Sequence, residues 1–139
     1  MPAEVLDSFA LIAYLRDESG AADVEQLLLD ASEKDSSLHM SEVNYAEVKY
    51  SIIRKDGRPA WAKAAAALQA LPIEFHPTSM DCAEVAADFK ARFRLSLADA
   101  FAAALAKERS AELVTGDPEF RALGNELKIR WLPFGSSKP

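Results

Sequence analysis

Four carboxylates occupy positions in the sequence that could bring them together: Asp7, Glu47, Asp99 and Asp117. Each lies at or near the start of a predicted helix, and three of them closely follow a predicted strand. Two like charges about 4 Å apart repel by about 4 kcal/mol at an effective dielectric constant near 20. Such a cluster therefore takes up protons or binds a cation. Oxygen ligands without an adjacent His or Cys suit Mg²⁺ or Mn²⁺ rather than zinc.

Each acid also has an ordinary structural role. Asp7 can be the N-cap of a helix that begins at the next residue, and Asp117 precedes a proline suited to the first helical position. Ser96 and Asp99 have the spacing of a capping box, which predicts the Asp99 carboxylate at the open end of its helix rather than as a buried charge. Glu47 can be a solvated helix residue. Only the joint placement of the four acids indicates a site.

The elements that would position these acids alternate along the chain. Strands are predicted at residues 3–7, 36–40, 71–76, 111–115 and 128–133. Longer segments with helical spacing separate them, among them 41–55 and 78–93. This alternation predicts an α/β fold, a three-layer α/β/α sandwich with a mainly parallel sheet of about five strands. The carboxyl ends of such strands share one edge, and the backward lean of a helical side chain aims Glu47 at it.

Local signals predict helix boundaries and core residues. Pro59 lies beside the start of an alanine-rich helix, and Thr78 with Asp81 has the spacing of a capping box. Aromatic residues at helical spacing are predicted to be mostly core, although some could form a partner surface; they are Tyr50, Trp61, Phe89 and Phe93.

Composition bounds the class of protein. The 139 residues, half of them hydrophobic, suit one domain over residues 1–134, with 135–139 expected to form a disordered tail. The single cysteine, Cys82, excludes an internal disulfide and is expected to be a buried small residue. The low cysteine count suits a reducing, cytoplasmic setting. An acidic N-terminus and the lack of a long apolar run predict a soluble protein without a secretory peptide or a membrane span. The net charge of −6 argues against broad attraction to nucleic acid, although it permits a local basic groove.

Missing motifs narrow the chemistry further. The sequence contains no Walker A motif, no G-x-G-x-x-G, no G-x-S-x-G and no D-x-D after the first strand. A divalent ion held by acids at a sheet edge suits phosphodiester hydrolysis, where it orients water, lowers the pKa of that water and neutralises charge on the phosphate.

Four segments, taken in order, resemble a known family. They are VLDSFALIAYL, MSEVNYAEVKYSI, LSLADAFAAALA and LVTGDPEF. Their order and spacing resemble a PIN domain, in particular the VapC-type toxins of toxin–antitoxin pairs, over nearly the whole chain. The resemblance implies an endoribonuclease dependent on Mg²⁺ or Mn²⁺, usually a homodimer, inhibited by a cognate antitoxin whose C-terminal segment covers the active site.

The resemblance also implies roles for individual residues. Asp7, Glu47, Asp99 and Asp117 match the acidic positions of the family. We expect Asp7 and Asp99 to be the principal metal ligands and Glu47 and Asp117 to bind metal directly or through water. A metal-activated water would then attack phosphorus in line. Glu42 competes with Glu47 for the second acidic position, but its sequence setting and the helical lean favour Glu47.

Three further positions match the family pattern near the acids. Ser8 and Thr115 match supporting hydroxyl residues, which equally well could act as local caps. Gly116 fits a position that varies in the family.

Positive charge for RNA contact is scattered rather than clustered. The basic candidates are Arg16, Arg54, Lys55, Arg58, Arg92, Arg94 and Arg121, most of them expected to be solvated. His39 and His76 end strand-like runs and are expected to be structural, although His39 could lie near the site.

Two alternatives remain open from the sequence. One is a housekeeping PIN-type nuclease that processes RNA or structured DNA and shares the site but not the toxicity. The other is a non-catalytic α/β module that binds a partner protein, in which the acids are only caps.

Overall fold

The computed structural model describes residues 3–133 and contains a five-stranded parallel sheet in the order β3-β2-β1-β4-β5. The predicted tail, 135–139, lies outside the described residues. The strands are β1 (Glu4–Leu6), β2 (Leu38–Ser41), β3 (Ile73–His76), β4 (Glu112–Thr115) and β5 (Ile129–Trp131). All five predicted strands are present, with ends displaced by no more than two residues.

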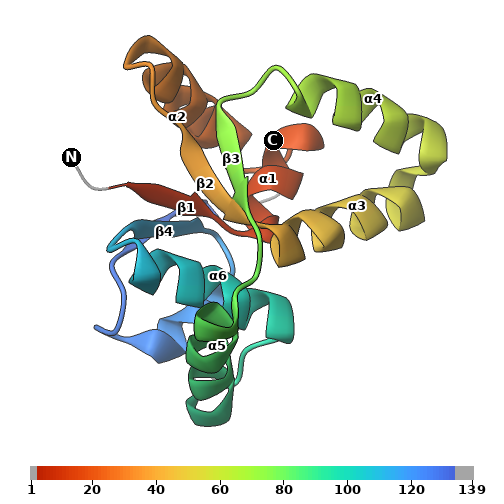
Figure 1. The fold of residues 1–139 in the computed structure, drawn as a ribbon. Helices are drawn as coiled ribbons and strands as arrows, with labels where there is room; N and C mark the ends of the chain where they lie inside the picture. Colours follow the sequence, from red (N-terminus) through yellow and green to blue (C-terminus); the bar gives the residue numbers. More distant parts are fainter. Residues whose placement is uncertain (1–2, 134–139) are drawn as a thin grey trace.

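Helices cover both faces of this sheet, so the predicted three-layer α/β/α fold is confirmed (Figure 1). They are α1 (Ser8–Leu15), α2 (Ala21–Glu33), α3 (Glu42–Asp56), α4 (Arg58–Leu68), α5 (Met80–Arg92) and α6 (Leu97–Glu108), followed by the short 3-10 helix η1 (Pro118–Leu123). Within residues 3–133, no helix has the length and apolar character needed to cross a bilayer.

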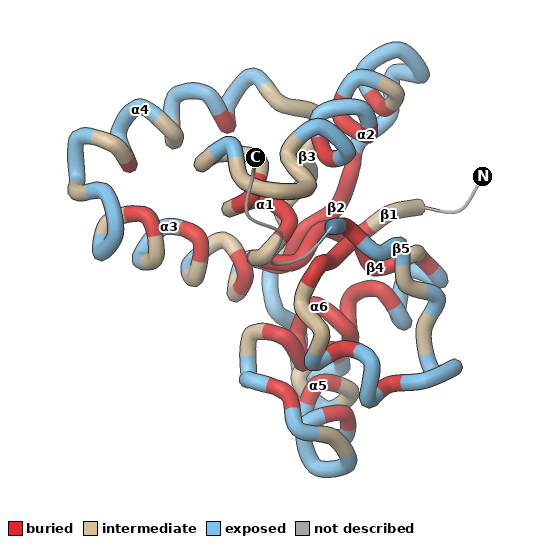
Figure 2. The backbone as a smooth tube through the Cα atoms, turned by 180° about the vertical axis from the view of Figure 1, so that it is seen from behind, coloured by how far each residue is buried: buried red, intermediate tan, exposed pale blue. Residues whose placement is uncertain are grey.

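Alternation along the strands divides the core into two clusters. Val5 packs with α5 and α6, whereas its neighbour Leu6 packs with α1 to α4 on the other face of the sheet. The central strands and the inner sides of the helices are buried, as the red segments of Figure 2 show. Residues at the carboxyl ends of the strands are therefore held by a rigid base.

The core residues and the cap of α5 agree only in part with the predictions from the sequence. Trp61 and Phe89 are buried, as predicted, and so is the free Cys82. Tyr50 is not part of the core, because the residue is 47% exposed on α3. The cap of α5 is Ser79 rather than Thr78: its hydroxyl accepts the Cys82 N–H at 3.0 Å.

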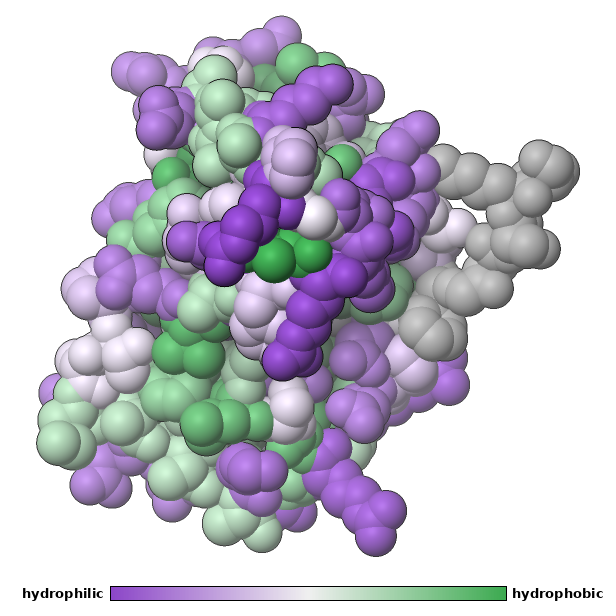
Figure 3. Space-filling model, turned by 90° about the vertical axis from the view of Figure 1, so that its right-hand side faces the viewer, coloured by the Kyte–Doolittle hydropathy of each residue, from purple (hydrophilic) through white to green (hydrophobic). Residues whose placement is uncertain are grey.

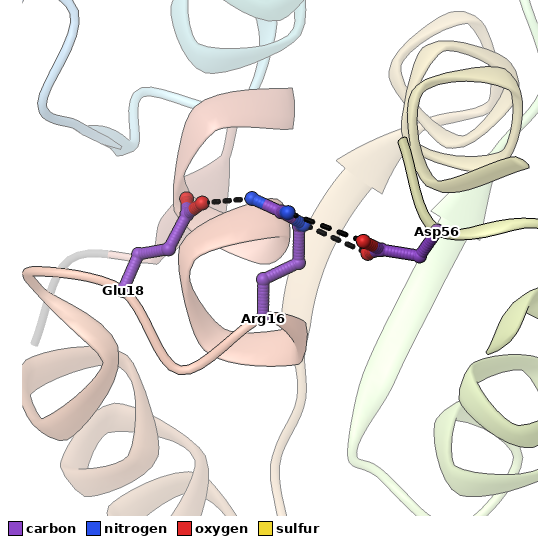
Figure 4. A network of polar contacts seen from close by, with 3 residues as sticks. All are labelled: Arg16, Glu18 and Asp56. Carbon is purple, nitrogen blue, oxygen red and sulfur yellow. Dashed lines mark hydrogen bonds and ion pairs between the residues drawn. The ribbon is translucent and has the colours of Figure 1, made fainter. Parts of the chain in front are cut away.

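An ion-pair network ties the end of α1 to the end of α3 (Figure 4). Arg16 donates through Nε to Asp56 Oδ2 at 2.8 Å and through Nη2 to Asp56 Oδ1 at 3.2 Å. It also pairs with Glu18. The hydrogen bonds from Arg16 hold the pKa of Asp56 below its ordinary value. Gly57, at φ 93°, then turns the chain directly into α4.

Candidate active site and metal centre

Asp7 lies between β1 and α1 and is fixed by hydrogen bonds to both carboxylate oxygens. Its Oδ1 accepts the Ala10 N–H at 2.9 Å, the N-cap interaction predicted from the sequence. Its Oδ2 accepts the hydroxyl of Thr115, at the end of β4. The Thr115 oxygen in turn accepts the Asp117 N–H at 3.0 Å. One hydroxyl thus connects the carboxylate of Asp7 to the backbone of Asp117.

Asp99 stands in the first turn of α6, as predicted. Ser96 caps this helix, its hydroxyl accepting the Asp99 N–H at 3.1 Å. The expectation that Asp99 escapes burial is wrong, because the residue is only 7% exposed. Helix α3 packs against α6, and Asp117 and Glu119 at the start of η1 approach the same carboxylate, so Asp99 is largely removed from water even at the end of its helix.

A third acid group comes from η1. Asp117 caps this short helix through Oδ1, which accepts the Glu119 N–H at 2.9 Å. Carboxylate oxygens of Asp99, Asp117 and Glu119 all lie within 4.8 Å of one another. Glu119 was missed in the sequence, although it follows Asp117 by two residues in the segment GDPEF. The only sequence signal for Glu119 was its position two residues after Asp117, the predicted N-cap, in the first turn of the following helix.

The structure separates Glu47 from its competitor Glu42. The charge of Glu47 acts directly on Asp99 and raises its pKa. Glu42 is exposed and instead lines a pocket with Tyr45, Leu68 and Phe75. Of the two glutamates, therefore, Glu47 lies in the electrostatic reach of the other acids.

The cluster is strained electrostatically when no cation is bound. Burial raises the pKa of Asp7 to about 8, with the charges of Asp99 and Asp117 adding to the effect and the Thr115 hydroxyl opposing it. Burial raises the pKa of Asp99 to about 7, and Asp117 and Glu47 contribute. Near neutral pH the group can be fully ionised only if a positive charge compensates it. An all-oxygen set of this kind fits a hard divalent cation.

Ser8 belongs to a buried polar network rather than to the acids. Asn44, fully buried in α3, donates through Nδ2 to Ser8 Oγ at 2.9 Å and to the Ala98 carbonyl at 3.2 Å. The Ser8 hydroxyl donates to the Asn44 carbonyl at 3.4 Å. Asn44 thus holds the first turns of α1, α3 and α6 together. This role was not predicted from the sequence, because a lone Asn in a helix is ordinarily solvated.

Gly116 lies against the Phe9 ring, so a side chain at this position would require the ring to move. A Cβ atom placed on it would lie 2.3 Å from Cε1 of Phe9. The absence of a side chain lets the backbone between Thr115 and Asp117 pass against the Phe9 ring, so that the Asp117 N–H reaches the Thr115 hydroxyl.

Comparison with known proteins identifies the family. A family model described as the PIN domain matches residues 5–126. The chain belongs to the PIN domain family. Among curated protein sequences, none matches this PIN domain protein.

Solved structures share the PIN fold of the chain at low sequence identity. VapBC2 from Rickettsia felis, bound to a DNA fragment from its promoter, has a TM-score of 0.75 at 17% identity, covering 94% of this chain and 99% of that one. DNA-bound VapBC from Salmonella typhimurium has a TM-score of 0.73 at 16% identity, covering 94% and 98%. The sarcin-ricin loop cleaving toxin VapC20 from Mycobacterium tuberculosis has a TM-score of 0.71 at 18% identity, covering 88% and 95%.

The basic residues of this PIN domain differ in how far they are already engaged. Arg16 is held by Asp56 and Glu18 (Figure 4), and Arg92 pairs with Glu126 at 3.2 Å. Arg121, in contrast, lines a pocket with Gly116, Pro118 and Trp131. Gly116 and Pro118 are the chain neighbours of Asp117. Trp131 is 45% exposed there. A cation and an aromatic face therefore line a pocket that includes both chain neighbours of Asp117, Gly116 and Pro118.

Proposed function

We propose that this PIN domain protein is an endoribonuclease, the toxin of a toxin–antitoxin pair, which hydrolyses RNA phosphodiester bonds with Mg²⁺ or Mn²⁺ bound. The observation that carries the proposal is the cluster of carboxylates at one sheet edge, with pKa values of about 8 for Asp7 and about 7 for Asp99. Capping alone explains neither the burial of two acids nor the convergence of Asp99, Asp117 and Glu119. This favours a nuclease over a non-catalytic module.

The acidic residues bind the metal ion in this proposal, and Thr115 orients one of them. Asp7 and Asp99 are the principal metal ligands in this proposal, and Glu47, Asp117 and Glu119 bind the ion directly or through water. When bound, the ion supplies Lewis acidity, activates water and neutralises charge on the scissile phosphate. Thr115 holds the Asp7 carboxylate in one orientation through its hydroxyl.

Recognition of RNA next to the acids rests on Arg121 and Trp131. An exposed indole offers a stacking surface for an unpaired base, and a guanidinium pairs with phosphate. Both line the pocket that begins at Gly116, so a base held there has its backbone near Asp117. A local contact of this kind suits a protein whose net charge is −6.

The partner we propose is an antitoxin protein. The neighbours in the comparison include VapBC pairs and a toxin–antitoxin complex from Klebsiella pneumoniae. In the present chain Leu97 is 56% exposed two residues before Asp99, a position where an apolar partner segment would cover the acids. Hydrophobic residues also reach the surface between hydrophilic ones on the side seen in Figure 3. A homodimer and a cytoplasmic location belong to the same proposal.

Cleavage of RNA by the purified protein tests the proposal. We expect cleavage with Mg²⁺ or Mn²⁺, its loss with chelator, and its recovery when the ion is restored. Asp99→Asn should be at least about 100-fold slower, whereas Glu42→Gln should match the wild type. Equal cleavage by Asp99→Asn would refute the assigned site. Growth arrest on expression of the protein alone separates a toxin from a housekeeping nuclease, since the latter leaves growth unaffected.

A further inference from the structure

A second group of potential ligands lies outside the acidic cluster, across β2 and β3. His39 pairs in register with Glu74, and His76 follows Glu74 by two residues on the same face of the edge strand. Leu38 and Met40 pack with the core on the α1 to α4 side, so alternation places His39 on the opposite face, toward α6. Three donor side chains therefore converge from two strands.

The distances among their donor atoms fit one metal ion. His39 Nδ1 and His76 Nε2 lie 2.9 Å apart. Glu74 presents one oxygen 3.8 Å from His39 Nδ1 and the other 3.7 Å from His76 Nε2. Donor atoms around a tetrahedral ion with bonds of about 2.0 to 2.1 Å lie about 3.3 to 3.4 Å apart. The three measured separations bracket that value, so small side-chain rotations suffice.

The imidazole rings of His39 and His76 contact each other through the two nitrogens that would bind the ion. Two imidazole nitrogens at 2.9 Å must share a proton, one donating and the other accepting. When that proton moves to the other nitrogen of its own ring, both nitrogens at the contact present lone pairs to an ion, and the carboxylate of Glu74 supplies negative charge. Burial, together with the charges of Arg109 and His76, lowers the pKa of His39, which favours its neutral, metal-binding form.

We propose that His39, Glu74 and His76 form a second metal site, which binds a borderline transition-metal ion such as Zn²⁺. Two imidazoles and one carboxylate are a ligand set for zinc, with a water in the fourth position, whereas the all-oxygen acidic cluster suits Mg²⁺ or Mn²⁺. Glu74 is exposed, so the ion reaches the site from solvent. Binding there cross-links the edge strand β3 to β2 and does not depend on the nuclease function.

The site is separate from the acidic cluster in both position and charge. Asp7 and Asp117 follow β1 and β4, and Glu47 and Asp99 lie in α3 and α6, whereas His39 lies within β2. The charges that act on His39 are those of Arg109, His76 and Glu74, and none belongs to the cluster. A metal ion held by the histidines therefore should be insensitive to changes at Asp99.

Titration with Co²⁺ as a spectroscopic substitute for Zn²⁺ tests the proposal on the full chain. We expect one equivalent to give the visible absorption of tetrahedral Co²⁺ and to be displaced by Zn²⁺. His76→Gln and, separately, the exposed Glu74→Gln should weaken binding at least about 10-fold, while Asp99→Asn keeps the signal. Glu74→Gln serves if His76→Gln does not fold. Zn²⁺ should raise the melting temperature of the wild type and of Asp99→Asn.

Three results would overturn the second site. The first is a wild-type protein that shows no tetrahedral Co²⁺ signal. The second is a signal that survives unchanged in folded His76→Gln and in Glu74→Gln. The third is a signal lost in Asp99→Asn, which would place the ion among the carboxylates instead.

Discussion

The hydroxyl of Thr115 donates a hydrogen bond to Asp7 Oδ2, although the two residues lie 108 positions apart in the chain. The parallel pairing of β1 with β4 makes this contact possible, because it aligns the ends of the two strands. The same oxygen accepts the Asp117 N–H. Asp7 and the backbone of Asp117 are thus held in fixed relation by one side chain.

Replacing Thr115 by Val should impair the site without changing its shape. Valine fills the same volume but neither donates to Asp7 nor accepts from Asp117, so the Asp7 carboxylate loses its orientation and its pKa rises further. We expect cleavage about 10- to 100-fold slower and a pH optimum displaced upward. Thr115→Ser retains the hydroxyl and is the matched control. Identical rates and pH optima in the two variants would contradict this role.

Stability should fall with rising pH in the absence of divalent ions. Folding raises the pKa values of Asp7 and Asp99 from 3.8 to about 8 and about 7, so between those limits the folded protein binds more protons than the unfolded chain. The contribution of these groups to the free energy of unfolding therefore decreases as pH rises from about 4 to about 8. Urea denaturation with chelator at pH 5 to 8 measures this slope. Asp99→Asn should flatten it; an unchanged slope would argue against the buried charge.

Glu119 should contribute to cation binding even though it is exposed. Its carboxylate lies within 4.8 Å of those of Asp99 and Asp117, whereas Glu42 faces a different pocket. We expect Glu119→Gln to weaken Mn²⁺ binding about 10-fold and Glu42→Gln to leave it unchanged, as measured by calorimetry. Equal affinities in the two variants would remove Glu119 from the site.

Trp131 and Arg121 should affect substrate binding more than the chemical step. Stacking of a base on an aromatic ring is worth about 1 to 3 kcal/mol, so Trp131→Ala should raise KM about 5- to 150-fold with kcat little changed. Arg121→Ala should raise KM as well and reduce its dependence on salt. Tyr50 carries Arg54 over its ring at 5.0 Å and does not line this pocket, so Tyr50→Ala is the matched control. A KM shift as large in Tyr50→Ala would refute a specific role.

The sequence sufficed for the fold and for most of the acidic cluster because both depend on local signals. Alternating strands and helices predict a parallel sheet, and the end of a strand specifies on which edge Asp7 and Asp117 lie. Asp99 could be assigned to the first turn of its helix through Ser96. Its burial could not, since that depends on how closely neighbouring helices pack over it.

Features that depend on contacts between distant segments escaped the sequence. From the sequence, Asn44 is expected to be solvated, because its buried hydrogen bonds depend on the packing of α1 and α6 against α3. The contact of Gly116 with the Phe9 ring likewise depends on how α1 packs beside the end of β4. His39 and His76 come together only through the register of β2 and β3. None of these relations has a signature in sequence spacing.

Binding of Mn²⁺ to the metal-free protein tests the central claim, that the acids form one cation site, most directly. Calorimetry at pH 7.5 should show Mn²⁺ binding to the wild type with release of protons, because Asp7 and Asp99 must ionise to accept the ion. Asp99→Asn should bind at least about 10-fold more weakly and release fewer protons. Equal affinity and equal proton release in folded Asp99→Asn would contradict the account.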